Sequence, residues 1–127
     1  MKKLAICIPT YNELDYLKQN LDSLIPQVKS FNKNVDLYVI DNFSNDGTNE
    51  YVNKLFDKIS NCYYRKNESN IGLHKNQLSC LQIEGYDYKI ILTFLVDDIK
   101  DTVKGDYIKP KLDRNAGNFA ANIHRVS

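Results

Sequence analysis

Four short apolar segments alternate with segments of helical periodicity along this chain, and this alternation limits the folds open to it. The apolar segments are residues 4–8, 35–40, 62–64 and 89–96. Short runs without polar alternation are typical of strands that are buried on both faces of a parallel sheet. The pattern therefore favours an open, mostly parallel sheet with helices on both faces, in three α/β/α layers.

Three helices are predicted between these strands. Apolar residues recur at helical spacing over residues 13–25, where Asn12 is expected to act as the N-cap and Pro26 to end or kink the helix. Two further helices are predicted around residues 51–59 and over residues 73–83. Each helix is followed by a strand, so the connections needed between parallel neighbours are all present.

Polar residues follow three of the predicted strands at the point where each strand ends. These stretches are Pro9-Thr10-Tyr11-Asn12, Asp41-Asn42 and Asp97-Asp98. In open α/β sheets, ligands bind beyond the carboxyl ends of the strands. The sequence therefore predicts a ligand site at this edge of the sheet.

The adjacent carboxylates of Asp97 and Asp98 indicate a bound cation. Two neighbouring carboxylates repel each other unless a cation or a set of hydrogen-bond donors lies between them. Mg²⁺ and Mn²⁺ take oxygen ligands, and a diphosphate supplies the oxygens that the protein does not. A solvated turn is the alternative interpretation. Because the pair follows the most apolar strand of the chain, we favour the metal and nucleotide interpretation.

Asp41 and Tyr11 have a binding interpretation and an ordinary one. Asp41 can accept hydrogen bonds from a base N–H or a ribose hydroxyl, or it can form an Asx turn in the loop that leads to Gly47. The ring of Tyr11 can stack on a base, or it can be an ordinary tyrosine among the nine in the chain. Residues 46–48 are predicted to be a turn and a helix start.

Composition excludes several classes of protein. The 17 basic and 16 acidic residues leave a net charge of +1, which argues against nucleic acid as a partner. The length of 127 residues supports one core. No apolar run reaches the roughly 20 residues of a membrane span, and no Walker, GxGxxG or GxSxG motif is present. A reducing, cytoplasmic environment is expected from the spacing of the three cysteines, which suits neither disulfides nor a CxxC metal site: Cys7, Cys62 and Cys80.

Four blocks, in this order and at these spacings, resemble family 2 glycosyltransferases. The blocks are LAICIPTYNELDYL, VDLYVIDNFSNDGT, the NIG turn of ESNIGLHKN, and FLVDDI. The resemblance covers residues 4–99 and implies the N-terminal, nucleotide-sugar-binding half of a GT-A fold, which is Rossmann-like. It divides the chain into a binding domain at residues 1–99 and a divergent C-terminal segment or tail at residues 100–127. The NIGLHKN and DD forms resemble the branch that builds bacterial surface polysaccharides.

The resemblance also implies a site and a reaction. Family members transfer sugar from a UDP- or dTDP-sugar with Mg²⁺ or Mn²⁺ to a glycan or lipid-linked acceptor, with inversion, at the cytoplasmic face of the membrane. A carboxylate base deprotonates the acceptor hydroxyl. The implied roles are Pro9 shaping the turn, Thr10 and Tyr11 flanking the base, Asp41 contacting the base edge, Asp97 near the ribose, and Asp98 binding the metal.

The chain departs from the family in its length and its C-terminal part. The family domain is longer, and its second half carries the acceptor site and the base. Nothing after residue 99 resembles that half, so the chain looks truncated and no catalytic residue is identified. A non-catalytic nucleotide-sugar-binding module or a remnant is the alternative. Residues 118–125 are expected to form a helix or part of a poorly ordered tail, and an exposed edge strand predicts self-association.

Overall fold

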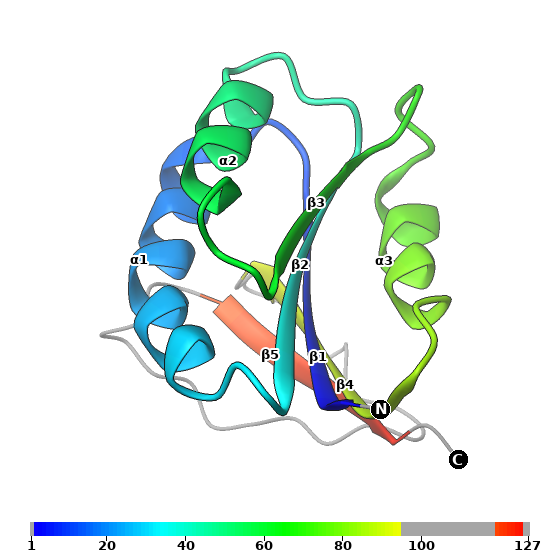
Figure 1. Cartoon of the computed structure of the whole chain (residues 1–127). Coiled ribbons are helices and arrows are strands. Elements are labelled where there is room, and N and C mark those ends of the chain that lie inside the picture. Colours follow the sequence, from blue (N-terminus) through cyan, green and yellow to red (C-terminus); the bar gives the residue numbers. More distant parts are fainter. Residues whose placement is uncertain (1, 95–118, 126–127) are drawn as a thin grey trace.

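A five-stranded sheet with helices on both faces forms the described part of the chain (Figure 1). The computed structural model describes residues 2–94 and 119–125. The strand order is β3-β2-β1-β4-β5, with β1 to β4 parallel and β5 antiparallel to β4. The elements are β1 (Lys2–Thr10), α1 (Leu14–Ser30), β2 (Val35–Asp41), α2 (Thr48–Phe56), β3 (Cys62–Lys66), α3 (Leu73–Leu81), β4 (Tyr86–Phe94) and β5 (Phe119–Arg125).

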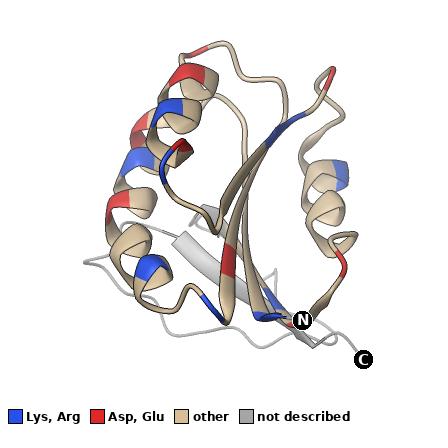
Figure 2. Ribbon diagram, in the orientation of Figure 1, with Lys and Arg blue, Asp and Glu red and all other residues tan. Residues whose placement is uncertain are grey.

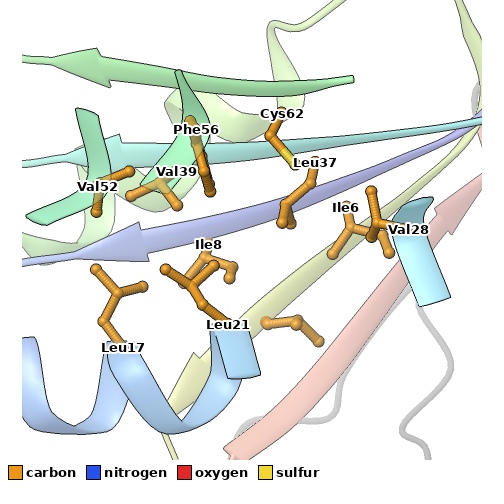
Figure 3. Close-up of a cluster of buried hydrophobic side chains, with 11 residues drawn as sticks. Ile6, Ile8, Leu17, Leu21, Val28, Leu37, Val39, Val52, Phe56 and Cys62 are labelled. Atoms are coloured by element: carbon orange, nitrogen blue, oxygen red, sulfur yellow. The ribbon is translucent and has the colours of Figure 1, made fainter. Parts of the chain in front are cut away.

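Two clusters of buried side chains, one on each face of the sheet, hold the layers together. Helices α1 and α2 cover one face and α3 covers the other (Figure 1). Because side chains alternate along a strand, Ile6 and Ile8 of β1 pack toward α1 and α2 (Figure 3), whereas Ala5 and Cys7 pack toward α3 with Cys80. Burial on both faces explains the apolar runs of β1, β2 and β4, and the three-layer α/β/α prediction is confirmed.

Helix α1 continues past Pro26, so the predicted end near residue 25 is wrong. Pro26 lacks the N–H that an interior helical residue donates, but it lies on the exposed side. Two residues later, Val28 is 1% exposed and belongs to the cluster under α1 and α2. Burial of Val28 offsets the lost hydrogen bond, and the helix runs to Ser30.

Strand β1 includes Pro9 and Thr10, so the turn begins at Tyr11 and not at Pro9 as expected. Pro9 pairs in register with Ile40 of β2. The carbonyl of Thr10 accepts a hydrogen bond from Asn42 on the β2 side, so the missing N–H of Pro9 would face β4. Pairing between β1 and β4 has already ended at Cys7, and Pro9 therefore costs no ladder bond there.

The C-terminal residues 119–125 form strand β5, which corrects the expected helix or tail. Ile123 lies opposite Ile90 in an antiparallel register that runs along β4. Beyond Ile91, β4 no longer pairs with β1, and β5 satisfies the hydrogen-bonding groups on the other side of β4. The pairing is distant in sequence, which explains why local periodicity did not reveal it.

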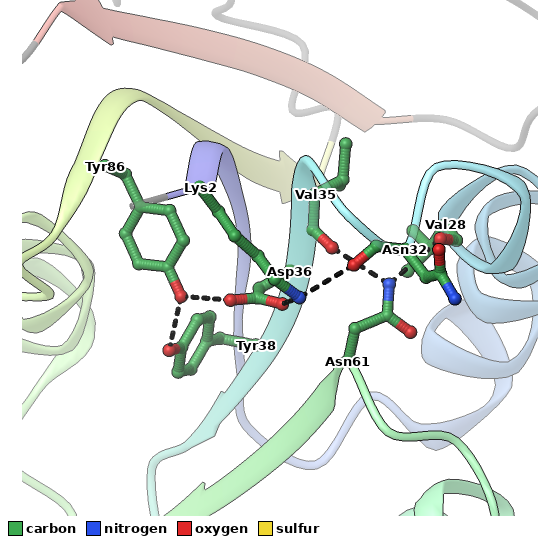
Figure 4. A network of polar contacts seen from close by, with 8 residues as sticks. All are labelled: Lys2, Val28, Asn32, Val35, Asp36, Tyr38, Asn61 and Tyr86. Carbon is green, nitrogen blue, oxygen red and sulfur yellow. Dashed lines mark hydrogen bonds and ion pairs between the residues drawn. The ribbon is translucent and has the colours of Figure 1, made fainter.

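Polar contacts at the amino end of the sheet join β1, β2 and β4 (Figure 4). Asp36 is 5% exposed; it forms an ion pair with Lys2 at 2.6 Å and accepts a hydrogen bond from Tyr86. The hydroxyls of Tyr38 and Tyr86 lie 2.8 Å apart. Within the described residues, no buried side-chain nitrogen or oxygen of this cluster lacks a hydrogen-bond partner, and the cluster lies at the opposite end of the strands from the predicted ligand site.

Candidate functional site

Three loops leave the carboxyl ends of β1, β2 and β3 and surround the predicted site. The sheet register places Thr10 beside Asp41, and Asp41 beside Lys66. Thr10 and Asp41, predicted as site residues from distant parts of the sequence, are therefore neighbours. Asp97 and Asp98 lie outside the described residues. Lysines alternate with Asp and Glu along α1 and α2 (Figure 2).

Asp41 is fully buried and organises the loop after β2. Its Oδ1 accepts hydrogen bonds from the backbone N–H of Ser44 at 3.0 Å and from the Ser44 hydroxyl at 2.6 Å. Its Oδ2 accepts one from the hydroxyl of Tyr64. Burial and this hydrogen bond raise the pKa of Tyr64, so the tyrosine keeps its proton. The carboxylate forms the turn that local sequence suggested; contact with a base stays a prediction.

Asn12 ties the loop after β1 to the loop after β2. Its backbone N–H donates to the Ser44 hydroxyl at 2.9 Å, and its Oδ1 accepts from the N–H of Asn45 at 2.8 Å. Asn12 has a positive φ of 47°. It therefore does not cap α1 as expected, because its side chain bridges two loops and Glu13 occupies the N-cap position.

Asp46 supplies the helix-capping contacts at this edge. Its Oδ2 accepts from the N–H of Leu14 at 3.1 Å, and its Oδ1 accepts from the Thr48 hydroxyl at 2.6 Å. Burial opposes ionisation of Asp46, but the hydrogen bonds from Thr48 and Leu14 outweigh it and lower its pKa. The predicted turn and helix start at residues 46–48 is confirmed. Burial and the nearby Asp46 charge raise the pKa of Glu13 to about 7.

An asparagine cluster, absent from the sequence predictions, joins the loops after β2 and β3 to α3. The amide of Asn42 donates to Asn70 at 2.8 Å, and its Oδ1 accepts from Asn67 at 3.0 Å. Asn67 also donates to Asn76, which reaches the carbonyl of Ile40. The sequence signal that could have revealed this cluster is the presence of asparagines in successive loops at one edge of the sheet. These hydrogen bonds fix the loops after β2 and β3 relative to each other and to α3.

Thr10 and Tyr11 differ in how they face solvent. Thr10 is 2% exposed, and its Oγ1 has no hydrogen-bond partner among the described residues. Buried hydroxyls nearly always have one, so Thr10 retains an unused donor and acceptor beside Asp41. The ring of Tyr11 is 42% exposed. Pro9, by contrast, is a buried strand residue.

Neither a metal cluster nor the hollow beside β3 coincides with this edge in the described part of the chain. Within residues 2–94 and 119–125, no three His, Cys, Asp or Glu side chains come together in a way that could hold a metal ion. The predicted ligand, Asp98, is not among them. A hollow of about 570 Å³ lies against β3 and includes Tyr38, Tyr63 and Arg65 in its lining, but none of the four predicted site residues that the structure describes.

Comparison with known proteins identifies the family. A sequence profile described as Glycosyl transferase family 2 matches residues 5–99. The chain belongs to glycosyltransferase family 2. Within this family, it is 37% identical over 90 residues to abequosyltransferase RfbV of Salmonella typhimurium, a match covering 67% of this chain and 26% of RfbV. It is 28% identical over 107 residues to glycosyltransferase GlyA of Streptococcus pneumoniae, covering 84% of this chain and 14% of GlyA.

Solved structures, a mannosyltransferase among them, share the fold of this family 2 chain. Mannosyltransferase PcManGT from Pyrobaculum calidifontis, in complex with GDP-Man and Mn²⁺, matches with a TM-score of 0.60 and 21% identity, over 70% of this chain and 26% of that one. S. aureus TarS in complex with UDP-GlcNAc matches with a TM-score of 0.55 and 23% identity, over 78% of this chain and 29% of the TarS chain. The GT-A fold prediction is confirmed.

The matched region is a fraction of each relative. The chain spans about a quarter of the length of RfbV and of PcManGT. None of the helices within residues 2–94 is both long enough and apolar enough to cross a lipid bilayer.

Proposed function

We propose that this chain binds the nucleotide-sugar donor of a glycosyltransferase at the carboxyl ends of β1 and β2. The observation that carries the proposal is the junction of the two loops there, through Asn12, Ser44 and Asp41, within the segment that the family profile matches. Two related folds were solved with GDP-Man and with UDP-GlcNAc. A rigid loop pair beside exposed rings suits recognition of a base and its sugar.

The proposed roles follow the family resemblance. Thr10 and Tyr11 flank the base, and the unpaired Thr10 hydroxyl supports this role. Asp41 contacts the base edge after it releases one of its hydrogen bonds to Ser44 or Tyr64, or it acts indirectly by holding the loop after β2 in place. Asp97 lies toward the ribose, and Asp98 holds Mg²⁺ or Mn²⁺ together with the diphosphate oxygens. When bound, the metal neutralises charge on the departing nucleoside diphosphate.

For the acceptor we propose a chemical class, and for the protein a location in the cell. The transfer is inverting, the acceptor is a glycan or lipid-linked sugar of a surface polysaccharide, and the protein works in the cytoplasm at the inner membrane face. RfbV is named as an abequosyltransferase, which fits sugar transfer in polysaccharide synthesis. The second candidate is a non-catalytic nucleotide-sugar-binding module. The loops after β1 and β2 account for binding of a donor, and none of the described residues is assigned as the catalytic base.

Calorimetric titration with UDP, dTDP and GDP, each with and without Mn²⁺, tests donor binding. We expect metal-dependent binding of one nucleotide and its loss in Asp98→Ala. The matched control is Asp57→Ala, which removes an exposed carboxylate just after α2 and should leave the dissociation constant unchanged. Release of nucleotide from the matching nucleotide sugar, with an acceptor supplied, then separates a transferase from a binding module. No nucleotide binding under any condition would refute both.

A further inference from the structure

Phe43 is held in an unfavourable backbone conformation with its ring in solvent. Its φ is +70°, and in the described part of the chain only Asn12 is another non-glycine residue with positive φ. A large aromatic residue is rare in this left-handed region because its Cβ crowds the backbone. The ring is nevertheless 49% exposed, so burial does not compensate for the conformation.

The neighbours of Phe43 explain why the conformation persists. Asn42 is 2% exposed and Ser44 is 4% exposed. Asn42 is bonded to Asn67, Asn70 and the N–H of Ile71, and Ser44 is bonded to Asp41. Two anchored residues leave the one between them little freedom. Strain that surrounding structure maintains is a mark of functional positions.

A cation lies over the same ring. The Nζ of Lys66, at the end of β3, is 5.3 Å from the centre of the Phe43 ring. Lys66 is itself exposed and is in register with Asp41. An exposed ring with an ammonium group beside it offers a stacking face for a flat base and a positive charge for a phosphate or a base carbonyl.

Phe43 is joined to the loop that carries Tyr11. Ser44, the next residue, accepts a hydrogen bond from the N–H of Asn12, and Asn12 follows Tyr11. The two exposed rings thus extend from loops that are fixed to each other beside the buried Asp41. Phe43 therefore differs from an ordinary exposed aromatic such as Phe31. Phe31 is 60% exposed at the end of α1 and has a negative φ of −110°.

We propose that Phe43 is a stacking contact for the nucleobase of the donor, with Lys66 beside it, and so helps to determine which base is accepted. This inference rests on the proposed function. The left-handed conformation at residue 43 directs the ring out of the loop, and the asparagine cluster keeps it there before the ligand arrives. Preorganised rings bind with less loss of side-chain entropy.

The test compares Phe43→Gly, Phe43→Trp and Phe31→Ala with wild type. Glycine adopts positive φ without strain, so Phe43→Gly should keep or raise the melting temperature while nucleotide affinity falls about tenfold or more. Phe43→Trp restores a ring and should retain affinity. Phe31→Ala removes an exposed ring elsewhere and should bind as wild type. Calorimetry with the nucleotide that wild type prefers, and with inorganic diphosphate plus Mn²⁺ as a probe without a base, gives the readout.

The outcomes separate the base contact from other roles. Weaker nucleotide binding by Phe43→Gly, with diphosphate binding unchanged, supports the inference. Unchanged nucleotide binding by Phe43→Gly, when wild type binds, overturns it and leaves the proposed function intact. Equal weakening toward nucleotide and diphosphate also overturns it, because the loop and not the ring is then responsible. If wild type binds no nucleotide, the proposed function fails and this inference fails with it.

Discussion

Glu13 begins α1 as a partly buried carboxyl beside Asp46, and this makes its ionisation matter to folding. Its pKa rises from an ordinary 4.5 to about 7, through burial first and then repulsion by Asp46. Below pH 4.5 the carboxyl is protonated in both the folded and unfolded states. Between about 4.5 and about 7 the unfolded chain releases the proton more readily, so this contribution to stability is lost as the pH rises.

We therefore expect Glu13→Gln to stabilise the protein at pH 8 but not at pH 4.5. The gain at pH 8 should be about 1 kcal/mol, because solvent screens a carboxyl that is only partly buried. Urea denaturation of wild type and variant at both pH values measures the difference in the free energy of unfolding. An equal difference at the two pH values would show that packing, and not charge, separates the side chains.

At the residue level, the sequence predicted which residues lie at the strand ends better than it predicted their hydrogen-bond partners. Thr10, Tyr11 and Asp41 were predicted from the strand ends, and the register brings Thr10 and Asp41 together. The contacts of Asn12 were not predictable, because its side chain bonds to Asn45 in another loop instead of capping its own helix. Such cross-loop bonds depend on how two strands align, which no local pattern records. The binding roles of these residues stay predictions.

At the scale of elements, Asn61 joins three of them from its place just before β3. It is 2% exposed, and its amide donates to the carbonyl of Val28 in α1 and to that of Val35 in β2, each at 2.9 Å (Figure 4). The backbone carbonyl of Asn61 also accepts from Leu37. The amide thus fixes the end of α1 against the start of β2.

We expect Asn61→Ala to lower the free energy of unfolding by about 2–3 kcal/mol, because it leaves two carbonyls without a donor in a buried place. Asn53→Ala, on the exposed side of α2, is the matched control and should change it by less than about 0.5 kcal/mol. Chemical denaturation of the two variants gives the comparison. A small effect at Asn61 would mean that water replaces the amide.

The elements themselves were predicted where burial imposed a pattern. Strands β1, β2 and β4 follow from apolar runs because both of their faces are covered, whereas only Cys62 of the edge strand β3 is buried. Two predictions failed where distant packing outweighed local preference. Because Val28 is buried, α1 continues past Pro26. The backbone hydrogen-bonding groups on the outer side of β4 pair with β5, a segment whose own periodicity is weak.

At the scale of the whole molecule, β3 is an edge of the sheet formed by residues 2–94 and 119–125, and its outer backbone groups have no strand partner within those residues. Tyr63, 42% exposed, stacks on Tyr38 with ring centres 5.0 Å apart and lines the hollow beside this edge. An open edge with exposed rings can pair with the same edge of a second copy.

We expect light scattering after size-exclusion chromatography to show a dimer that forms as concentration rises. Tyr63→Lys should weaken it, because a charge on an edge strand opposes pairing. Leu73→Lys, at a 72% exposed position on α3, is the control and should not. A monomer at every concentration would show that the edge does not self-pair.

The strand order also has a consequence for how the chain reaches this fold during synthesis. Strand β1 is central: it pairs with β2, its nearest neighbour in sequence, and with β4, where Lys2 lies opposite Tyr86. As the ribosome releases the chain, β1, β2 and β3 can assemble early, while the other side of β1 stays open until β4 emerges. Long-range pairings form slowly, and an open central strand attracts other chains. The nascent protein is thus most vulnerable to aggregation in the interval before β4 is released.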